Sequence, residues 1–203
     1  MYKRQVYDGY CLSGRVDEEK FYLAVGSGRN GKGKHLSTLA SIAGDYGMAL
    51  PQHSLTGDTY SHSEWMVPLA ACRLAYIADL PQSGGWRSPL LKTLTGGDSI
   101  SAHKMRMNSI TFRPKAKLWI GCNHKPGVSG DDRALYERML LVSYRDTFTE
   151  ENADTHLSDK LRAELPGVLN RVLAGAKTYY EHGLPRPSTA STCLLYTSPS
   201  PRD

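Results

Sequence analysis

The stretch Gly26-Ser-Gly-Arg-Asn-Gly-Lys-Gly-Lys34 decides the fold of this chain, because its glycines and lysines have the spacing of a phosphate-binding loop. The apolar run at 21–25 before it predicts a buried strand, and the apolar spacing of 36–42 after it predicts a helix. Between a strand and a helix, glycine-rich backbone can turn its N–H groups toward an anion, and the helix N-terminus adds a favourable dipole. The stretch therefore predicts a site for nucleotide phosphates.

The loop matches the pattern G-x-x-x-x-G-K-[ST] at Gly26, Gly31 and Lys32, and the lysine of this pattern reaches the β- and γ-phosphates. It departs from the pattern at Gly33, which replaces the hydroxyl residue that usually contacts magnesium. A glycine-rich surface turn is the alternative interpretation, because the chain contains 19 glycines. The flanking strand and helix favour the phosphate loop.

Length and cysteine use restrict the class of protein. A chain of 203 residues suits one sizeable domain with an appendage. Its four cysteines include no C-x-x-C pair, which indicates neither a zinc site nor a disulfide framework and fits a reducing cytosol. Because the sequence has no run of 18 apolar residues, we expect no membrane partner and a cytoplasmic location.

Both ends of the sequence look foreign to the domain. Residues 1–5 and 193–203 resemble the conceptual translation of a sequencing adapter, so we expect the native segment to be 6–192, a piece of a longer gene. Within it we expect an ATPase core over 6–150 and a C-terminal helical segment over 151–192.

The charge distribution points to nucleic acid more clearly than the total charge. The formal net charge of +5 falls to +3 without the two terminal segments, which is only mildly basic. Residues 103–117, however, contain no acid and five basic residues, which are Lys104, Arg106, Arg113, Lys115 and Lys117.

Alternating apolar runs and helical stretches predict an α/β fold with a parallel central sheet and helices on both faces. Strands are expected at 74–78, 118–122 and 139–142, and helices around 34–43, 62–72 and 87–94. Ligands bind at the carboxyl ends of strands in such sheets. Since Lys32, Asp79 and Asn123 all follow strand ends, we expect them to share one site.

The remaining segments predict a hairpin and a helical end. Residues 98–117 alternate loosely around turn-forming residues, which predicts a hairpin with a basic, polar tip at 104–109. A solvated surface hairpin without function is the alternative. Residues 155–184 predict one or two helices that break at Pro166-Gly167.

Three side chains suit phosphoryl chemistry. A carboxylate at the position of Asp79 can hold magnesium, directly or through water, and polarise the attacking water. Asn123 offers a donor and an acceptor to the γ-phosphate or the water, and Arg138 could reach a neighbouring subunit's phosphate as an arginine finger. The structural alternatives are turn residues for the first two and a salt bridge to Glu137 or Asp132 for Arg138.

In this order the motifs resemble the superfamily 3 helicase domain of phage and plasmid primase–helicases. Three segments carry the resemblance, which covers about residues 20–187. They are Gly28-Arg-Asn-Gly-Lys32, Leu94-Thr-Gly-Gly-Asp-Ser-Ile100 and Phe112-Arg-Pro-Lys-Ala-Lys-Leu-Trp-Ile-Gly-Cys-Asn-His-Lys-Pro126.

The resemblance implies an AAA+-like P-loop NTPase core that forms a ring, usually a homo-hexamer, with ATP and Mg²⁺ between subunits and single-stranded DNA in the pore. It implies Asp79, Asn123 and Arg138 as catalytic residues, with Asp79 at the metal. The implied ATP-binding residues are Gly26, Gly28, Asn30, Gly31, Lys32, Gly33 and Lys34, and the implied DNA contacts are Lys104 and Arg106. The chain departs from the family at Gly33, at Asp79, where glutamate is more common, and at His103, where arginine is usual.

We therefore expect a fragment of an ATP-dependent DNA helicase of viral or mobile-element origin that acts in a bacterial host cell. A primase domain upstream in the full-length protein stays open. Two other functions also stay open: a P-loop ATPase motor that acts on another substrate, and a non-catalytic nucleotide- and DNA-binding module, which Gly33 and Asp79 would suit.

Overall fold

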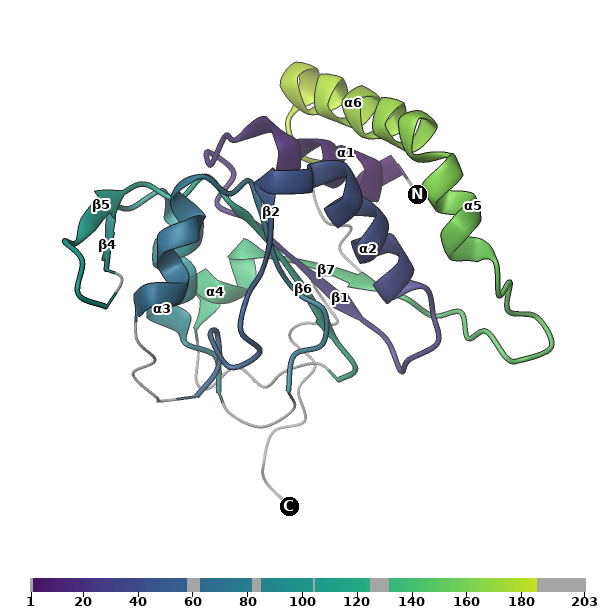
Figure 1. Ribbon diagram of the computed structural model, residues 1–203, viewed down its shortest axis with the longest axis horizontal. Helices are drawn as coiled ribbons and strands as arrows, with labels where there is room; N and C mark the ends of the chain where they lie inside the picture. The colour runs from purple at the N-terminus through teal and green to yellow at the C-terminus, as the bar shows by residue number, and fades with distance from the viewer. Residues whose placement is uncertain (1, 58–62, 82–84, 104, 125–131, 186–203) are drawn as a thin grey trace.

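The computed structural model describes residues 2–57, 63–81, 85–103, 105–124 and 132–185, and it shows a parallel sheet between layers of helices (Figure 1). The five strands, named in their order across the sheet, are β2 (Gly47–Ala49), β3 (Leu74–Ile77), β6 (Lys117–Cys122), β1 (Phe21–Val25) and β7 (Met139–Ser143). All neighbouring pairs are parallel. The predicted α/β fold is confirmed.

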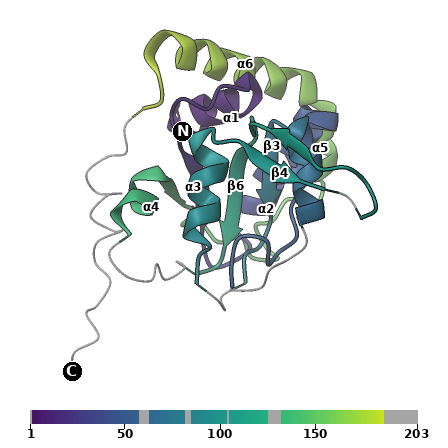
Figure 2. The same cartoon turned by 90° about the vertical axis from the view of Figure 1, so that its left-hand side faces the viewer.

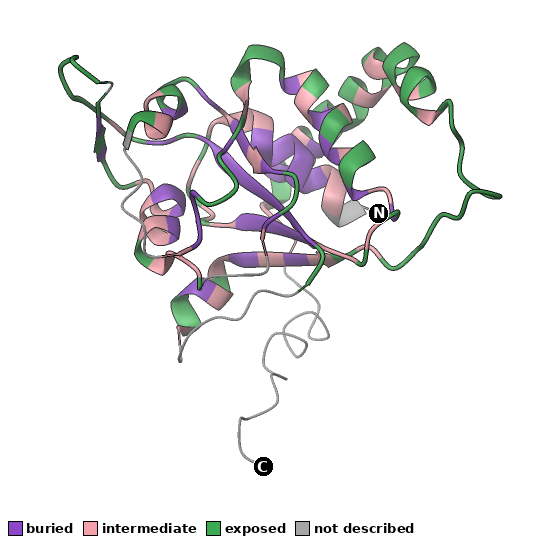
Figure 3. Ribbon diagram, turned by 60° about the horizontal axis from the view of Figure 1, so that its bottom comes forward, coloured by how far each residue is buried: buried purple, intermediate pink, exposed green. Residues whose placement is uncertain are grey.

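Alternate residues of strand β1, which lies between β6 and β7, enter two separate hydrophobic cores. Phe21 and Leu23 face one core, and Tyr22 and Ala24 face the other. The first core is covered by the 3-10 helix η2 (Ser63–Ala70), α3 (Ser88–Gly96) and α4 (Arg133–Arg138), and the second by α1 (Tyr2–Ser13), α2 (Lys32–Ala43) and α6 (Leu165–His182). Burial on both faces, visible in Figure 3, explains why the strands are continuous apolar runs in the sequence.

Helix α1 was not predicted from the sequence. It packs along α6, as two views show (Figures 1 and 2). Gly9 lies so close to α6 that a Cβ on it would be 2.5 Å from the carbonyl carbon of Gly175 and 2.7 Å from Cα of Ala176. The two helices therefore meet backbone to backbone, and only glycine allows that approach. The helix begins within the segment 1–5 that we expected to be foreign, and 193–203 lies outside the described residues.

Two helical predictions were inaccurate for reasons that involve proline. Residues 63–70 form a 3-10 helix, in which Pro68 lacks an N–H donor. The C-terminal helices α5 (Leu157–Ala163) and α6 separate at Glu164 rather than at Pro166-Gly167. Pro166 lies in the first turn of α6, where its fixed φ and missing donor are tolerated.

The predicted hairpin is present as the antiparallel strands β4 (Ile100–Ala102) and β5 (Ile110–Phe112). Its turn extends away from the sheet (Figure 2), and Met105 and Met107 are 70% and 66% exposed. Arg106 lies between them with a left-handed φ of 63°. Lys104 lies outside the described residues.

The described cysteines Cys11, Cys72 and Cys122 are free and buried, and burial raises the pKa of each thiol above its ordinary value. Among the helices that the structure describes, none is both long enough and apolar enough to cross a membrane.

Lys117 does not belong to the basic surface that the sequence indicated. Its side chain is buried at the start of β6, where Nζ donates to the carbonyl oxygen of Lys115 at 2.7 Å and lies 4.7 Å from the centre of the Tyr10 ring. Desolvation lowers the pKa of this amine from 10.5 to about 8.

Lys117→Met should stabilise the protein at pH 7 by about 2 kcal/mol, because the native state then no longer holds a buried ammonium. The unfolded chain keeps its proton to a higher pH than the folded one, so wild-type stability should rise between pH 8 and 10.5 and the advantage of the variant should shrink. Urea unfolding of both proteins across this pH range measures the difference. A difference that stays constant with pH would contradict the lowered pKa.

Candidate functional site

The glycine-rich loop leads from the end of β1 into α2, and its glycines meet different requirements. Gly28 and Gly31 have φ values of 102° and 84°, a left-handed region that other residues rarely adopt. At Gly26 a Cβ would clash with the Asn30 amide and lie 2.5 Å from the backbone oxygen of Tyr144. The result is a tight loop that ends at the N-terminus of α2, a position that attracts anions.

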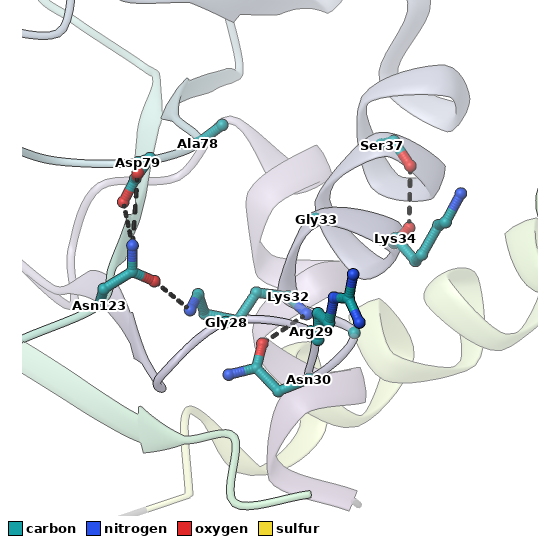
Figure 4. A pocket seen from close by; sticks show the side chains of 11 residues that line it. Gly28, Arg29, Asn30, Lys32, Gly33, Lys34, Ser37, Ala78, Asp79 and Asn123 are labelled. Carbon is teal, nitrogen blue, oxygen red and sulfur yellow. Dashed lines mark hydrogen bonds between the residues drawn. The ribbon is translucent and has the colours of Figure 1, made fainter. Parts of the chain in front are cut away.

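Lys32, Asn123 and Asp79 form a hydrogen-bonded chain beside this loop (Figure 4). Lys32 Nζ donates to Asn123 Oδ1 at 3.1 Å and also to the carbonyl oxygen of Gly26. Asn123 Nδ2 in turn lies 3.2 and 3.4 Å from the two carboxylate oxygens of Asp79. The structure thus brings together three side chains that follow three neighbouring strands, as their positions at strand ends indicated. Their catalytic roles stay predictions.

A pocket of about 460 Å³ opens over the loop. It combines cationic side chains and a helix N-terminus with one carboxylate and two amides, a set that suits phosphate groups and the divalent cation that such phosphates carry. Its lining residues are Gly28, Arg29, Asn30, Gly31, Lys32, Gly33, Lys34, Ser37, Ala78, Asp79 and Asn123. Arg29 and Ser37 were not predicted as site residues from the sequence. Ser37 lies one helical turn beyond Gly33, and this spacing could have indicated that it faces the pocket. Gly26 contributes its carbonyl to Lys32 from beneath the loop.

Space does not explain the missing hydroxyl at Gly33. A Cβ at this position would meet no described atom within 4 Å, and its backbone is ordinary helix. A serine or threonine would therefore fit, and its absence is a property of the sequence rather than of the fold.

Arg138 lies at the opposite end of the sheet from the loop. It ends α4 directly before β7, whose first residue pairs with the first residue of β1. Its guanidinium is held within the chain: Nη2 is 2.7 Å from a carboxylate oxygen of Glu19, and Nη1 donates to Thr95 Oγ1 at 3.2 Å. Arg138 therefore does not share a pocket with Lys32 of the same chain.

The two acids that the sequence suggested as salt-bridge partners of Arg138 pair with other residues. Glu137 pairs with Arg133 at 2.8 Å, and Asp132 pairs with Lys92 at 2.8 Å. The salt-bridge alternative named the wrong acids, because the actual partner, Glu19, is more than a hundred residues distant in the sequence.

The threonine-glycine-glycine-aspartate motif ends α3 and begins the hairpin. Thr95 is buried against Arg138, and Gly97 has a left-handed φ of 75° at the C-cap of α3. The motif thus links the arginine to the hairpin that contains Arg106.

The five-stranded parallel sheet, with a glycine-rich loop between strand β1 and helix α2, defines the P-loop class of α/β proteins. Within that class, residues 24–138 match the model described as "Family of unknown function (DUF5906)", and the chain belongs to this family.

Its relatives are viral. The chain is 29% identical over 197 residues to "Putative helicase L207/L206" of Acanthamoeba polyphaga mimivirus. This alignment covers 87% of this chain and 20% of the relative. It is 23% identical over 194 residues to "Putative helicase V13" of Sputnik virophage, with 86% and 25% covered. The chain thus spans a fifth to a quarter of these relatives. The predicted resemblance to helicases is confirmed as distant homology to viral proteins that carry this name.

The fold is also that of a solved structure, the apo C-terminal region of NrS-1. One crystal form superposes with a TM-score of 0.67 at 12% sequence identity, covering 96% of this chain and 47% of that one. A second apo structure, of residues 305–718 of the same protein, gives a TM-score of 0.68 at 13% identity, with the same shares covered. At this level of identity the likeness concerns the fold alone.

The loop glycines should respond in opposite ways to alanine. Gly26→Ala should destabilise the protein by about 1–3 kcal/mol, because the added methyl group collides with the backbone of Tyr144. Gly33→Ala should stabilise it by up to about 1 kcal/mol, because open space surrounds a helical position where glycine is unfavourable. Urea unfolding of the two variants measures both effects, and equal losses would refute the loop geometry.

Proposed function

We propose that this chain is the ATPase core of a replicative DNA helicase of viral or mobile-element origin. It would couple hydrolysis of ATP, with Mg²⁺, to movement along single-stranded DNA. The hydrogen-bonded chain from Lys32 through Asn123 to Asp79 carries this proposal, because it aligns a phosphate-binding cation, a neutral amide and a metal-binding carboxylate beside one pocket. Homology to viral proteins with helicase names supports it.

The residues of the pocket divide the work of phosphoryl transfer. Lys32 exchanges Asn123 and the Gly26 carbonyl for the β- and γ-phosphates and stabilises the charge that develops there. The amide of Asn123, released from the lysine, orients the attacking water. Asp79 would hold a magnesium ion or a water bound to it, and that ion would supply positive charge to the phosphates.

Arg138 completes the proposed site from a second copy of the chain. In a homo-hexameric ring the end of the sheet that holds Arg138 faces the pocket of the neighbour. Glu19 and Thr95 hold the guanidinium in place there, and its positive charge stabilises the negative charge on the transferred phosphate. Action in the cytoplasm of a bacterial host belongs to this proposal, and a primase domain upstream in the full-length protein stays open.

One observation favours a second function, a nucleotide-binding DNA-binding module without turnover. The hydroxyl that normally helps to hold magnesium is absent at Gly33 although the fold has room for it. A nucleotide would then act as a structural ligand of the same pocket.

ATP turnover stimulated by single-stranded DNA distinguishes the two functions. Wild-type protein should hydrolyse ATP faster when an oligonucleotide is added, and Lys32→Ala should lower turnover at least about a hundredfold, because it removes the charge that stabilises transfer. Lys177→Ala, which removes an exposed lysine on α6, is the matched control and should retain activity. Nucleotide binding without turnover in the wild type would select the non-catalytic module, and stimulation by a substrate other than DNA would select a different motor.

The hairpin should bind the DNA backbone without reading sequence. Lys104→Ala with Arg106→Ala should weaken binding to all single strands alike and lower the slope of log affinity against log salt by about 0.7 for each lost phosphate contact. The exposed thioethers of Met105 and Met107 can pack against any base. Salt titrations compare this double variant with Arg171→Ala plus Lys177→Ala on α6. Parallel lines and equal affinities for wild type and hairpin variant would place DNA elsewhere.

A further inference from the structure

His35 of α2 lies one turn beyond Lys32 and is hydrogen-bonded through both ring nitrogens. Its Nε2 is 3.0 Å from a carboxylate oxygen of Asp8 in α1, and its Nδ1 is 2.6 Å from the hydroxyl of Tyr144, which follows β7. The rings of Tyr22 and Trp119 meet the imidazole edge to face, with centroids 6.4 and 6.1 Å away. The imidazole thus joins three elements behind the phosphate loop.

The chemistry of the partners assigns the protons. An ionised carboxylate only accepts, so Nε2 carries a proton and donates it to Asp8. Nδ1 is paired with the hydroxyl of Tyr144, and burial raises the pKa of this phenol above its ordinary value. The other polar groups around Tyr144 are the hydroxyl of Tyr22, 3.4 Å from its own, and the guanidinium of Arg4, 5.0 Å from its ring centre.

The backbone of Tyr144 supports the phosphate loop directly. Its N–H donates to the carbonyl oxygen of Val25 at 2.7 Å, and its carbonyl accepts from Asn30 Nδ2 at 3.4 Å. Asn30 Oδ1 in turn accepts from the backbone N–H of Lys32 at 3.4 Å. A displacement of Tyr144 would therefore move the beginning, the middle and the end of the loop together.

We propose that Asp8, His35 and Tyr144 are positioning residues that fix the phosphate loop and couple nucleotide binding to the docking of helix α1. None of them lines the pocket, so they act through Asn30 and Lys32. Thermodynamic linkage makes the coupling reciprocal. If docking of α1 raises the affinity of the loop for nucleotide, a bound nucleotide stabilises the docked α1 to the same extent. The inference rests on the proposed binding of ATP.

Tyr144→Phe tests the positioning role, because it deletes one hydroxyl and leaves the ring and the backbone contacts in place. Affinity for the fluorescent nucleotide mant-ATP with Mg²⁺ should fall about fivefold, the factor that corresponds to one hydrogen bond. Tyr179→Phe is the matched control: this buried tyrosine on α6 donates to Asp17 at 2.7 Å and does not touch the loop. Both variants should lose a few degrees of melting temperature, whereas the control should bind mant-ATP as the wild type does.

Hydrogen exchange tests the coupling. Mant-ATP should slow exchange of the α1 amides in the wild type, and this protection should be lost in His35→Leu, which removes both hydrogen bonds. If His35→Leu does not fold, Tyr144→Phe takes its place, with α3 on the other face of the sheet as the internal reference.

The outcomes separate the inference from the function on which it rests. Wild-type protein that binds mant-ATP while Tyr144→Phe binds it equally well, or while α1 gains no protection, overturns the positioning network alone. Wild-type protein that does not bind mant-ATP overturns the proposed nucleotide site and the network together.

Discussion

The charge of Lys32 is the constraint on which the rest of the structure depends. The residue is only 6% exposed, and an unpaired ammonium at such a position would cost several kcal/mol. The ammonium donates hydrogen bonds to Asn123 and to the Gly26 carbonyl, and Asp79 accepts a hydrogen bond from the asparagine. These groups can meet only if β6 lies between β1 and β3, which is the observed order. The pairing of the buried lysine therefore requires this strand order.

Most of the sheet could be predicted from the sequence because its strands are buried on both faces. Such strands are short apolar runs, and each predicted run became a strand. Helix α1 escaped prediction because its buried face mixes Tyr7, Tyr10 and Gly9 with only two small apolar residues, Val6 and Cys11, and because its partner α6 is distant in the sequence. The three-residue strand β2 begins with glycine and has no apolar run of its own. The helix boundary was wrongly predicted at Pro166, because the sequence does not distinguish a proline in the first turn of a helix from one that ends a helix.

The pocket was predictable to the extent that strand ends are predictable. Lys32, Asp79 and Asn123 follow three strands and meet, since carboxyl ends of parallel strands share an edge. The side chains that hold the site from behind were not predictable, because their partners are set by packing between distant elements. His35 with Asp8 is such a pair, and Arg138 with Glu19, at the opposite end of the sheet, escaped prediction for the same reason. Lys117 shows the same limit, since nothing in a basic stretch distinguishes a buried lysine from an exposed one.

The contact between α1 and α6 also sets the timing of folding on the ribosome. Roughly 150 residues separate the end of α1 from the start of α6, so synthesis of the intervening chain takes on the order of ten to thirty seconds. During that interval the tyrosines Tyr7 and Tyr10 of the nascent helix lack the surface that covers them in the finished domain. Aggregation or capture by a chaperone is most favourable then, and a substitution that loosens α6 would prolong the interval. Such a substitution would lower the yield of folded protein without changing the chemistry of the pocket.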